Sequence, residues 1–133
     1  MPIADTEVLF AMNPRDDRHA KALRALRVKG LRVPDTALLE FQVVLRARGR
    51  RPEEVAAALE ALGSILAAHR VPELRTLGLG LLVRQAEIER SYGLSYFDSL
   101  IAASALAYDG VVISDDAAFD KVPGLRRIPL RDL

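Results

Sequence analysis

Short apolar runs alternate with stretches of helical periodicity along this chain. The run Val111–Ile113 is typical of a strand buried on both faces of a parallel sheet. Between the apolar runs, hydrophobic residues recur at spacings of three and four, as they do on one side of a helix. This alternation predicts an α/β fold. We expect a three-layer α/β/α sandwich with a parallel sheet of about five strands and helices on both faces.

The predicted elements divide the whole chain without a linker or an internal repeat. The strands span Pro2–Ala4, Leu31–Val33, Arg70–Glu73, Val111–Ile113 and Arg127–Pro129. The helices span Thr6–Met12, His19–Lys29, Thr36–Arg48, Pro52–His69, Leu82–Tyr92 and Tyr96–Tyr108, with a helical turn at Ala117–Lys121. Glycines follow three of these helices and a proline begins one, as is usual at helix ends. The 133 residues are therefore expected to form one domain, 1–133.

Composition excludes several functional classes. Half of the residues are hydrophobic and 28% are charged, which is typical of a globular domain. The absence of cysteine excludes a disulfide framework, a cysteine-ligated metal and a thiol nucleophile, and it fits a cytoplasmic protein. The apolar runs are too short to span a membrane. Because the net charge is only +1, any contact with nucleic acid must come from local clusters of basic residues.

Four acidic positions lie where a parallel α/β fold binds ligands. Asp5 directly follows the first strand, and Asp115 and Asp116 directly follow the Val-Val-Ile strand, at the carboxyl ends where ligands bind. Glu40 and Asp98 lie within apolar helices, where a carboxylate is costly unless it is paired or bound to metal. Converging carboxylates repel one another, and a divalent cation that prefers oxygen ligands, such as Mg²⁺ or Mn²⁺, removes that repulsion. We therefore expect a metal site built from these acids.

Each acid also has an ordinary structural explanation. Asp5 can cap the helix that follows it, and Asp98 can form a capping box with Ser95. Either acid of the 115–116 doublet can cap the last helical turn, and Glu40 can point into solvent. Capping is compatible with metal binding, because it places a carboxylate at a helix start beside the crevice. Capping alone does not explain why all four occur together.

The segments around these acids resemble a known family. They are Asp5–Leu9, Glu40, Tyr92–Ala103 and Ile113–Asp120, which contains the pattern Ser114-x-Asp116-x-x-Phe119. Over essentially its whole length the chain resembles the PIN-domain family, and within it the VapC-like ribonucleases of toxin–antitoxin pairs. The segment around Asp98 and the pattern that ends at Phe119 are the most specific parts of the resemblance.

The resemblance implies an activity and the residues that carry it. It implies a divalent-metal-dependent endoribonuclease in which one or two Mg²⁺ or Mn²⁺ ions activate water for in-line attack on an RNA phosphodiester bond. The implied catalytic and metal-binding residues are Asp5, Glu40, Asp98 and Asp116. Motif spacing selects Asp116 over Asp115 and leaves Asp120 near the rim of the site. Thr6 and Ser114 become hydroxyl groups that either orient the carboxylates or act only as caps.

The resemblance also implies partners, and alternatives remain open. A VapB-like antitoxin is the implied partner, and the apolar helices of so small a chain predict a homodimer. The alternatives are a non-toxin RNA-processing nuclease and a binding module whose catalytic site has decayed. A dehalogenase-type phosphatase is disfavoured because Glu7 stands where that family has a second aspartate, and a receiver domain because Lys121 does not follow the last strand. The arginines at 46–51 either contact RNA phosphates or are solvated beside a helix end.

Overall fold

The computed structural model describes residues 1–133 as an α/β domain with five strands, six α-helices and two short 3₁₀-helices. The strands are β1 (Ile3–Ala4), β2 (Val33–Pro34), β3 (Glu73–Leu74), β4 (Val111–Ile113) and β5 (Arg126–Ile128). The α-helices are α1 (Thr6–Phe10), α2 (His19–Ala25), α3 (Asp35–Ala47), α4 (Pro52–Ala68), α5 (Leu79–Tyr92) and α6 (Tyr96–Leu106). The 3₁₀-helices are η1 (Ala117–Lys121) and η2 (Leu130–Asp132). None of the helices is both long and apolar enough to cross a membrane.

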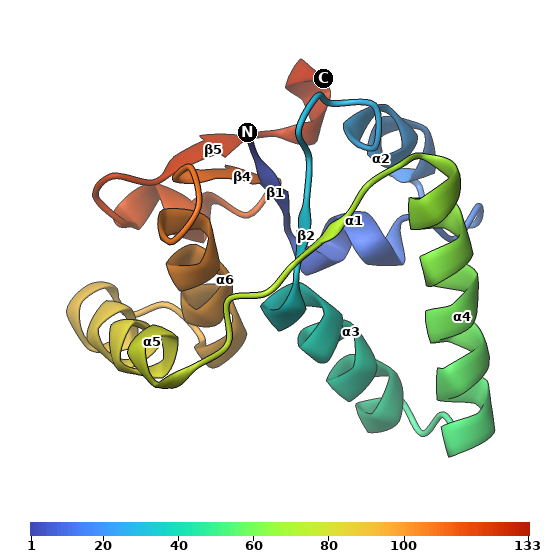
Figure 1. Ribbon diagram of the computed structural model, residues 1–133, viewed down its shortest axis with the longest axis horizontal. Coiled ribbons are helices and arrows are strands. Elements are labelled where there is room, and N and C mark those ends of the chain that lie inside the picture. Colours follow the sequence, from blue (N-terminus) through green and yellow to red (C-terminus); the bar gives the residue numbers. More distant parts are fainter.

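All strand pairs are parallel, so the predicted fold class is confirmed. The strands form a three-stranded sheet in the order β1-β4-β5 and a two-stranded sheet of β2 and β3, where a single sheet was expected. A bridge between Ile3 and Arg32 joins the two sheets, which places the five strands in the order β3-β2-β1-β4-β5 (Figure 1). The chain runs outward from β1 to β3 and then returns to β4 on the other side of β1. Ligands bind at such a reversal, beyond the carboxyl ends of β1 and β4.

Helix α6 is the central helix of the fold. Every residue from Ser99 to Ala105 is buried, because α6 packs against β4, α3 and α5. Its N-terminus is fixed by Ser95, whose Oγ accepts a hydrogen bond from the backbone N–H of Asp98 at 3.2 Å. A helix buried on all sides keeps its position, so the acid in its first turn is held in place as well.

A buried chain of hydroxyl groups fixes α3 against α6. Thr36 Oγ1 and Ser104 Oγ are 2.7 Å apart, and Thr76 Oγ1 lies 2.9 Å from the same serine oxygen. Thr76 also donates both its N–H and its hydroxyl to the carboxylate of Asp35, at 2.9 Å and 2.7 Å. These hydrogen bonds join the start of α3, the middle of α6 and the segment before α5. They set the spacing of the two helices that carry Glu40 and Asp98.

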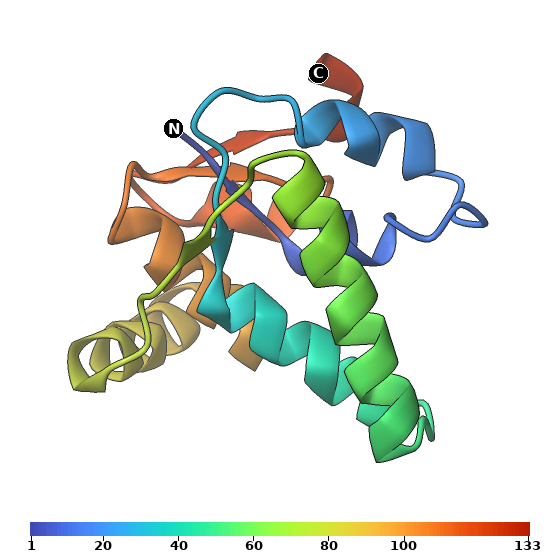
Figure 2. The same cartoon turned by 45° about the vertical axis from the view of Figure 1, so that its right-hand side comes forward.

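Helices α3 and α4 project together from the sheet and meet at the turn between them, in both views of the molecule (Figures 1 and 2). Helix α4 begins with Pro52, and the Arg51 N–H donates to the Glu54 carboxylate at 3.0 Å, which closes a capping box. Helix α3 lines a cleft beside α1. The sequence predicted both helices to within one or two residues.

Three boundaries differ from the sequence prediction by three or four residues. Helix α2 ends at Ala25, four residues early, because the N–H groups of Arg27 and Val28 bond to carbonyls only three residues back. Helix α5 begins at Leu79, three residues early, despite the glycines at 78 and 80. Strand β3 lies at Glu73–Leu74 because Arg70 is left-handed, with φ 56°. The parallel partner β2 is correspondingly shifted toward Pro34.

Candidate metal centre

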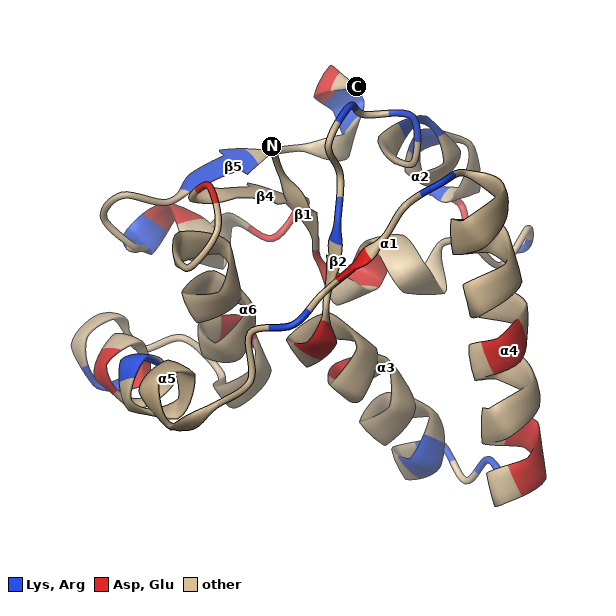
Figure 3. Ribbon diagram, in the orientation of Figure 1, with Lys and Arg blue, Asp and Glu red and all other residues tan.

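A cleft of about 500 Å³ lies beyond the carboxyl ends of β1 and β4. Its walls come from α1 and the loop after it, from α3, from the first turn of α6 and from the start of η1. All four acids predicted from the sequence line this cleft: Asp5, Glu40, Asp98 and Asp116. Figure 3 shows red segments on α1, α3 and α6 around the ends of β1 and β2. Residues up to 111 positions apart in sequence are therefore gathered on one surface.

Asp5 is the most buried of the four acids. It is the N-cap of α1, where its Oδ1 accepts from the Thr6 N–H at 2.7 Å and its side chain is only 5% exposed. Burial raises the pKa of Asp5 to about 7, helped by the charges of Glu7 and Asp98 and opposed by hydrogen bonds from Ser114 and Thr6. A carboxylate in this position gains a great deal from a nearby cation.

One buried hydroxyl connects the ends of β1 and β4. Ser114 Oγ donates to Asp5 Oδ2 at 2.7 Å and accepts from the Asp116 N–H at 3.0 Å. Asp116 is the N-cap of η1, and its Oδ1 accepts from the Ala118 N–H at 2.9 Å. Asp116 thus both caps η1 and lines the cleft. Ser114 therefore sets the relative position of two of the four acids.

Asp98 and Glu40 complete the set from two neighbouring helices. Burial, chiefly, together with the charges of Asp116 and Glu40, raises the pKa of Asp98 to about 6. Both side chains are partly buried and line the same cleft. Two carboxyl groups with raised pKa values, each acting on neighbouring acids, mark a site where negative charge is concentrated.

The structure separates the two acids of the doublet. Asp115 turns away from the cleft, and its Oδ1 accepts from the backbone N–H of Leu130 at 2.8 Å. Asp116, one residue later, lines the cleft. Asp120 is exposed and lies outside it, where Arg127 binds its two carboxylate oxygens at 3.0 Å each. That arginine lowers the pKa of Asp120.

Sequence reasoning missed four charged residues of the cleft: Glu7, Arg15, Asp16 and Arg18. Glu7 accepts from the Ser114 hydroxyl at 3.3 Å, from the backbone N–H of Asp115 and from Arg18 at 3.2 Å. Arg18 also binds both carboxylate oxygens of Asp16, at 3.1 Å and 3.0 Å. Nothing in the sequence distinguished Glu7, because an acid in the first turn of a helix is ordinary. Its partners lie 11 and more than 100 residues away.

The side chains present fit a hydrated divalent cation. Thr6 Oγ1 is buried beside Asp5 and has no hydrogen-bond partner in the protein, so a water or a ligand is needed there. No three carboxylate or imidazole groups lie close enough to enclose an ion by themselves. Mg²⁺ does not require such a cage, because it keeps several waters and is usually held by one or two carboxylates with substrate phosphates. The all-oxygen set of donors favours Mg²⁺ or Mn²⁺ over Zn²⁺.

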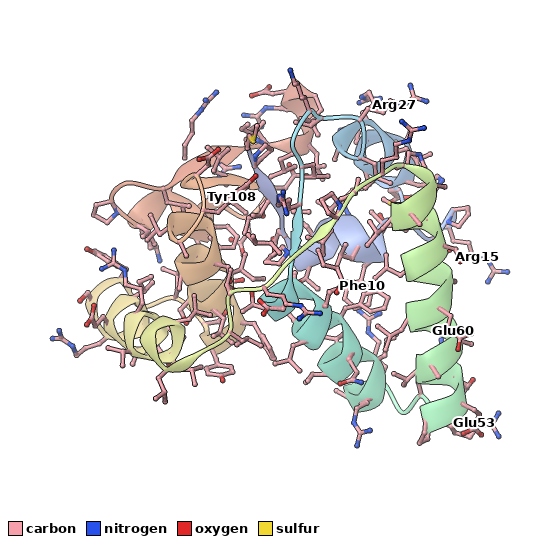
Figure 4. The ribbon with its side chains drawn as sticks, in the orientation of Figure 1. Phe10, Arg15, Arg27, Glu53, Glu60 and Tyr108 are labelled. Carbon is pink, nitrogen blue, oxygen red and sulfur yellow. The ribbon has the colours of Figure 1, made fainter.

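The cleft also has a basic and aromatic wall. The Arg48 guanidinium lies 4.9 Å from the centre of the Phe10 ring, which itself packs 4.7 Å from the ring of Phe41. Figure 4 shows Phe10 between α1 and α3. Arg48 and Arg15 line the cleft without an ion-pair partner, whereas Arg50 and Arg51 pair with glutamates of α4. Of the arginines singled out in the sequence, only Arg48 faces the acids.

The model of the PIN-domain family matches residues 3–125. The chain therefore belongs to the PIN-domain family, whose members are typically metal-dependent nucleases. The match spans all four acids, and the resemblance found in the sequence is confirmed. No curated protein sequence matches the chain.

Solved structures with a similar fold include toxin–antitoxin proteins at low sequence identity. VapBC2 from Rickettsia felis, bound to a DNA fragment from its promoter, has a TM-score of 0.69 at 17% identity, and 96% of each chain is covered. The sarcin–ricin-loop-cleaving toxin VapC20 from Mycobacterium tuberculosis has a TM-score of 0.68 at 19% identity, over 90% of this chain and 93% of that one. FitAcB from Neisseria gonorrhoeae has a TM-score of 0.68 at 19% identity, over the whole of both chains. At these identities the likeness establishes the fold.

Proposed function

We propose that residues 1–133 act as a single nuclease domain, an endoribonuclease that depends on Mg²⁺ or Mn²⁺. One observation carries the proposal. Four carboxylates from the β1–α1 junction, α3, α6 and the β4–η1 loop line one cleft, and two of them have raised pKa values. Concentrated negative charge at the reversal point of a parallel sheet is suited to a cation that then binds an anionic substrate.

In this proposal the acids bind the cation, a serine positions two of the acids, and two arginines contact the substrate. Asp5, Glu40, Asp98 and Asp116 would hold the cation. When bound, the cation supplies a water of lowered pKa and neutralises charge on the scissile phosphate. Ser114 holds Asp5 at a fixed rotamer and fixes the Asp116 backbone. Arg15 and Arg48 line the same cleft, where they would contact RNA phosphates.

We expect Asp98→Asn to abolish metal-dependent RNA cleavage while leaving the fold intact. The variant keeps the N-cap hydrogen bond of α6, because that bond uses the Asp98 N–H rather than its side chain. The measurement is cleavage of a broad panel of RNAs with Mn²⁺ and with EDTA, using both proteins purified in parallel. The exposed Asp17→Asn serves as the control, since Asp17 does not line the cleft. Equal cleavage by Asp98→Asn and wild type would contradict the proposal.

RNA cleavage by the wild-type protein distinguishes a nuclease from a binding module. If no RNA in the panel is cleaved with Mn²⁺, the nuclease proposal is wrong. Isothermal titration with Mn²⁺ then decides what remains. Binding without cleavage leaves a metal-binding module, and no binding leaves a scaffold with a decayed site.

We also propose a cellular role, which rests on the proposed nuclease activity. The similar folds of proteins solved as toxin–antitoxin complexes support a VapC-type toxin with a VapB-like antitoxin as partner, acting on RNA in the cytoplasm. A non-toxin RNA-processing nuclease uses the same cleft. The two roles differ in whether a neighbouring gene encodes an antitoxin, so the nuclease proposal stands independently of this one.

We also propose a homodimer, and the structure offers a surface for it. Leu79 and Val83 on α5 are 86% and 59% exposed, beside the exposed Leu77 and Leu82. An apolar patch of this kind on a small domain is suited to burial against a second copy. Sedimentation at micromolar concentration should show a dimer, and the double variant Leu79→Glu/Val83→Glu should be monomeric. Arg90→Glu on the same helix is the matched control. A wild type that sediments only as a monomer would refute the dimer.

A further inference from the structure

A second pocket lies at the opposite end of the strands from the acidic cleft. It has a volume of about 390 Å³ and lies between the α2–β2 loop, the end of α4 and the end of α6. Figure 3 shows blue segments on the α2–β2 loop and where α4 ends, and Figure 4 shows Arg27 and Tyr108 beyond the ends of α2 and α6. The proposed nuclease activity does not use this pocket, since none of the four acids lines it.

The pocket is basic, and its positive charges are not neutralised by the protein. Four of its lining residues are cations: Arg27, Lys29, Arg32 and Arg70. No carboxylate lines the pocket, and none of the four cations forms an ion pair. Asp109, at the end of α6, is paired with the amino group of Met1 at 2.9 Å. Six other arginines of the chain form ion pairs, whereas all four cations of this pocket, which has no carboxylate in its lining, do without one.

One of the four cations is already held in position. Arg32 Nε donates to the Tyr108 hydroxyl at 3.2 Å, and the guanidinium lies 5.6 Å from the centre of the tyrosine ring. Neither of the two terminal nitrogens of Arg32, Nη1 and Nη2, makes a hydrogen bond to the protein. A planar guanidinium fixed through Nε is ready for a bidentate contact with a phosphate group. The backbone N–H groups of Lys29 and Gly30, in the adjacent loop, also donate to no protein acceptor.

Arg70 adds evidence of a different kind. It follows the C-cap of α4 in the left-handed conformation, with φ 56°, and it is the one non-glycine residue of the chain with positive φ. Glycine is the usual residue at this position, because a side chain there is strained. An arginine side chain at a place that favours glycine, directed to a pocket with three other unpaired cations, points to a use for that side chain.

We propose that this pocket binds a phosphate group, through Arg32, Arg70 and Lys29. The ligand is a phosphate-bearing molecule, either a nucleic-acid backbone or a small free phosphate. The two sources share the chemistry of a tetrahedral anion that accepts charge-assisted hydrogen bonds from guanidinium and ammonium groups. The pocket would give the protein a phosphate contact at the far end of the sheet from its acidic cleft.

The test is a titration followed by ¹⁵N–¹H NMR on the whole protein in EDTA, so that it does not depend on cleavage. Inorganic phosphate should shift the amides of Gly30, Arg70 and Tyr108 saturably, and sodium chloride at the same ionic strength should not. A short RNA is titrated in parallel. If RNA shifts the same amides at lower concentration, the ligand is a nucleic-acid backbone. If only inorganic phosphate does, the ligand is a small phosphate.

Matched variants test the residues. Arg70→Gly removes the guanidinium while giving the backbone its preferred residue, so the melting temperature should hold or rise. With Lys29→Ala added, phosphate affinity should fall about tenfold or more, the usual loss when charge-assisted hydrogen bonds are removed. Arg90→Ala, an exposed arginine without an ion pair on α5, should bind phosphate as wild type does. The proposal is overturned if neither phosphate nor RNA gives a shift beyond that of chloride, or if the double variant keeps wild-type affinity.

Discussion

Replacing Asp5 by asparagine is expected to stabilise the metal-free protein at pH 8 and to abolish cleavage. Burial raises the pKa of Asp5 from 3.8 to about 7, so above pH 7 the folded protein must keep a poorly solvated charge. The asparagine carries no charge. At 1.36 kcal/mol per pKa unit, the gain in free energy of unfolding is about 2–4 kcal/mol.

The stabilisation by Asp5→Asn is expected to depend on pH. Between about pH 4 and pH 7 the folded protein binds a proton at Asp5 that the unfolded chain releases, so stability falls as the pH rises through that range. Below pH 4 the carboxyl group is neutral in both states and the asparagine brings no gain. The advantage of Asp5→Asn is therefore expected to grow from pH 4 to pH 7 and then to stay constant.

The hydrogen bonds around residue 5 accommodate the change. The asparagine oxygen accepts from the Thr6 N–H, and its amide group donates to Ser114 Oγ. The serine hydroxyl then turns to Glu7, whose carboxylate is already 3.3 Å away. Ser114 keeps its bond from Asp116 as well, since a hydroxyl oxygen can accept twice. Each hydrogen bond that Asp5 and Ser114 make in the wild type is thus kept or replaced.

Urea unfolding in EDTA at pH 4, 6 and 8 measures the effect, with Asp17→Asn as the control. Added Mn²⁺ should reverse the order, because a cation that binds the folded wild type stabilises it and the variant lacks a ligand. Cleavage by Asp5→Asn should be absent at every pH. A variant that is less stable than the wild type at pH 8, or equally shifted at all three pH values, would contradict the burial of a charge at Asp5.

Phe119→Ala is expected to be the most destabilising single change near the site. The ring is fully buried on η1, and it packs in the main core although its neighbours on either side are polar or small. Removing a buried phenylalanine side chain typically costs about 3–5 kcal/mol, partly for transfer and partly for the cavity left behind. This is a large part of the stability of a domain of this size.

The loss should appear in function as well as in stability. Asp116 is the N-cap of η1, so loosening that short helix frees the carboxylate. Thermal unfolding of wild type, Phe119→Leu and Phe119→Ala should give a graded series, with Mn²⁺ affinity falling in the same order. Phe119→Ala with wild-type stability would show that η1 is not held by its ring.

The fold was predictable because its signals are local. Helices with apolar faces, and glycine or proline at their ends, were placed to within a few residues, as α4 and α6 show. The elements set by distant partners were less predictable. Strand β2 is aligned by its pairing with β3, and β3 in turn is shifted by the left-handed turn at Arg70. Neither influence is visible in a window of ten residues.

The acids of the candidate site could be placed from local sequence signals, whereas the long-range contacts among them could not. Asp5 and Asp116 follow strands, and the topology of a parallel α/β fold brings such positions together. The hydrogen bonds among them are contacts across the whole chain. Glu7 looked like an ordinary acid of a first helical turn. In the doublet at 115–116 motif spacing selected Asp116, and the contact that takes Asp115 out of the cleft, with Leu130, was not visible in the sequence.

The hydrogen bond between Leu130 and Asp115 links the C-terminal residues to the loop beside the cleft. Asp115 holds the backbone of Leu130, whose side chain is fully buried, while the N–H of Asp115 is held by Glu7. Anything that pulls at the C-terminal turn, such as an affinity tag or a truncation after Ile128, acts on the loop that carries Asp116. It would also release a further carboxylate next to four others. A C-terminal fusion is therefore a poor choice for measuring what the unmodified protein does.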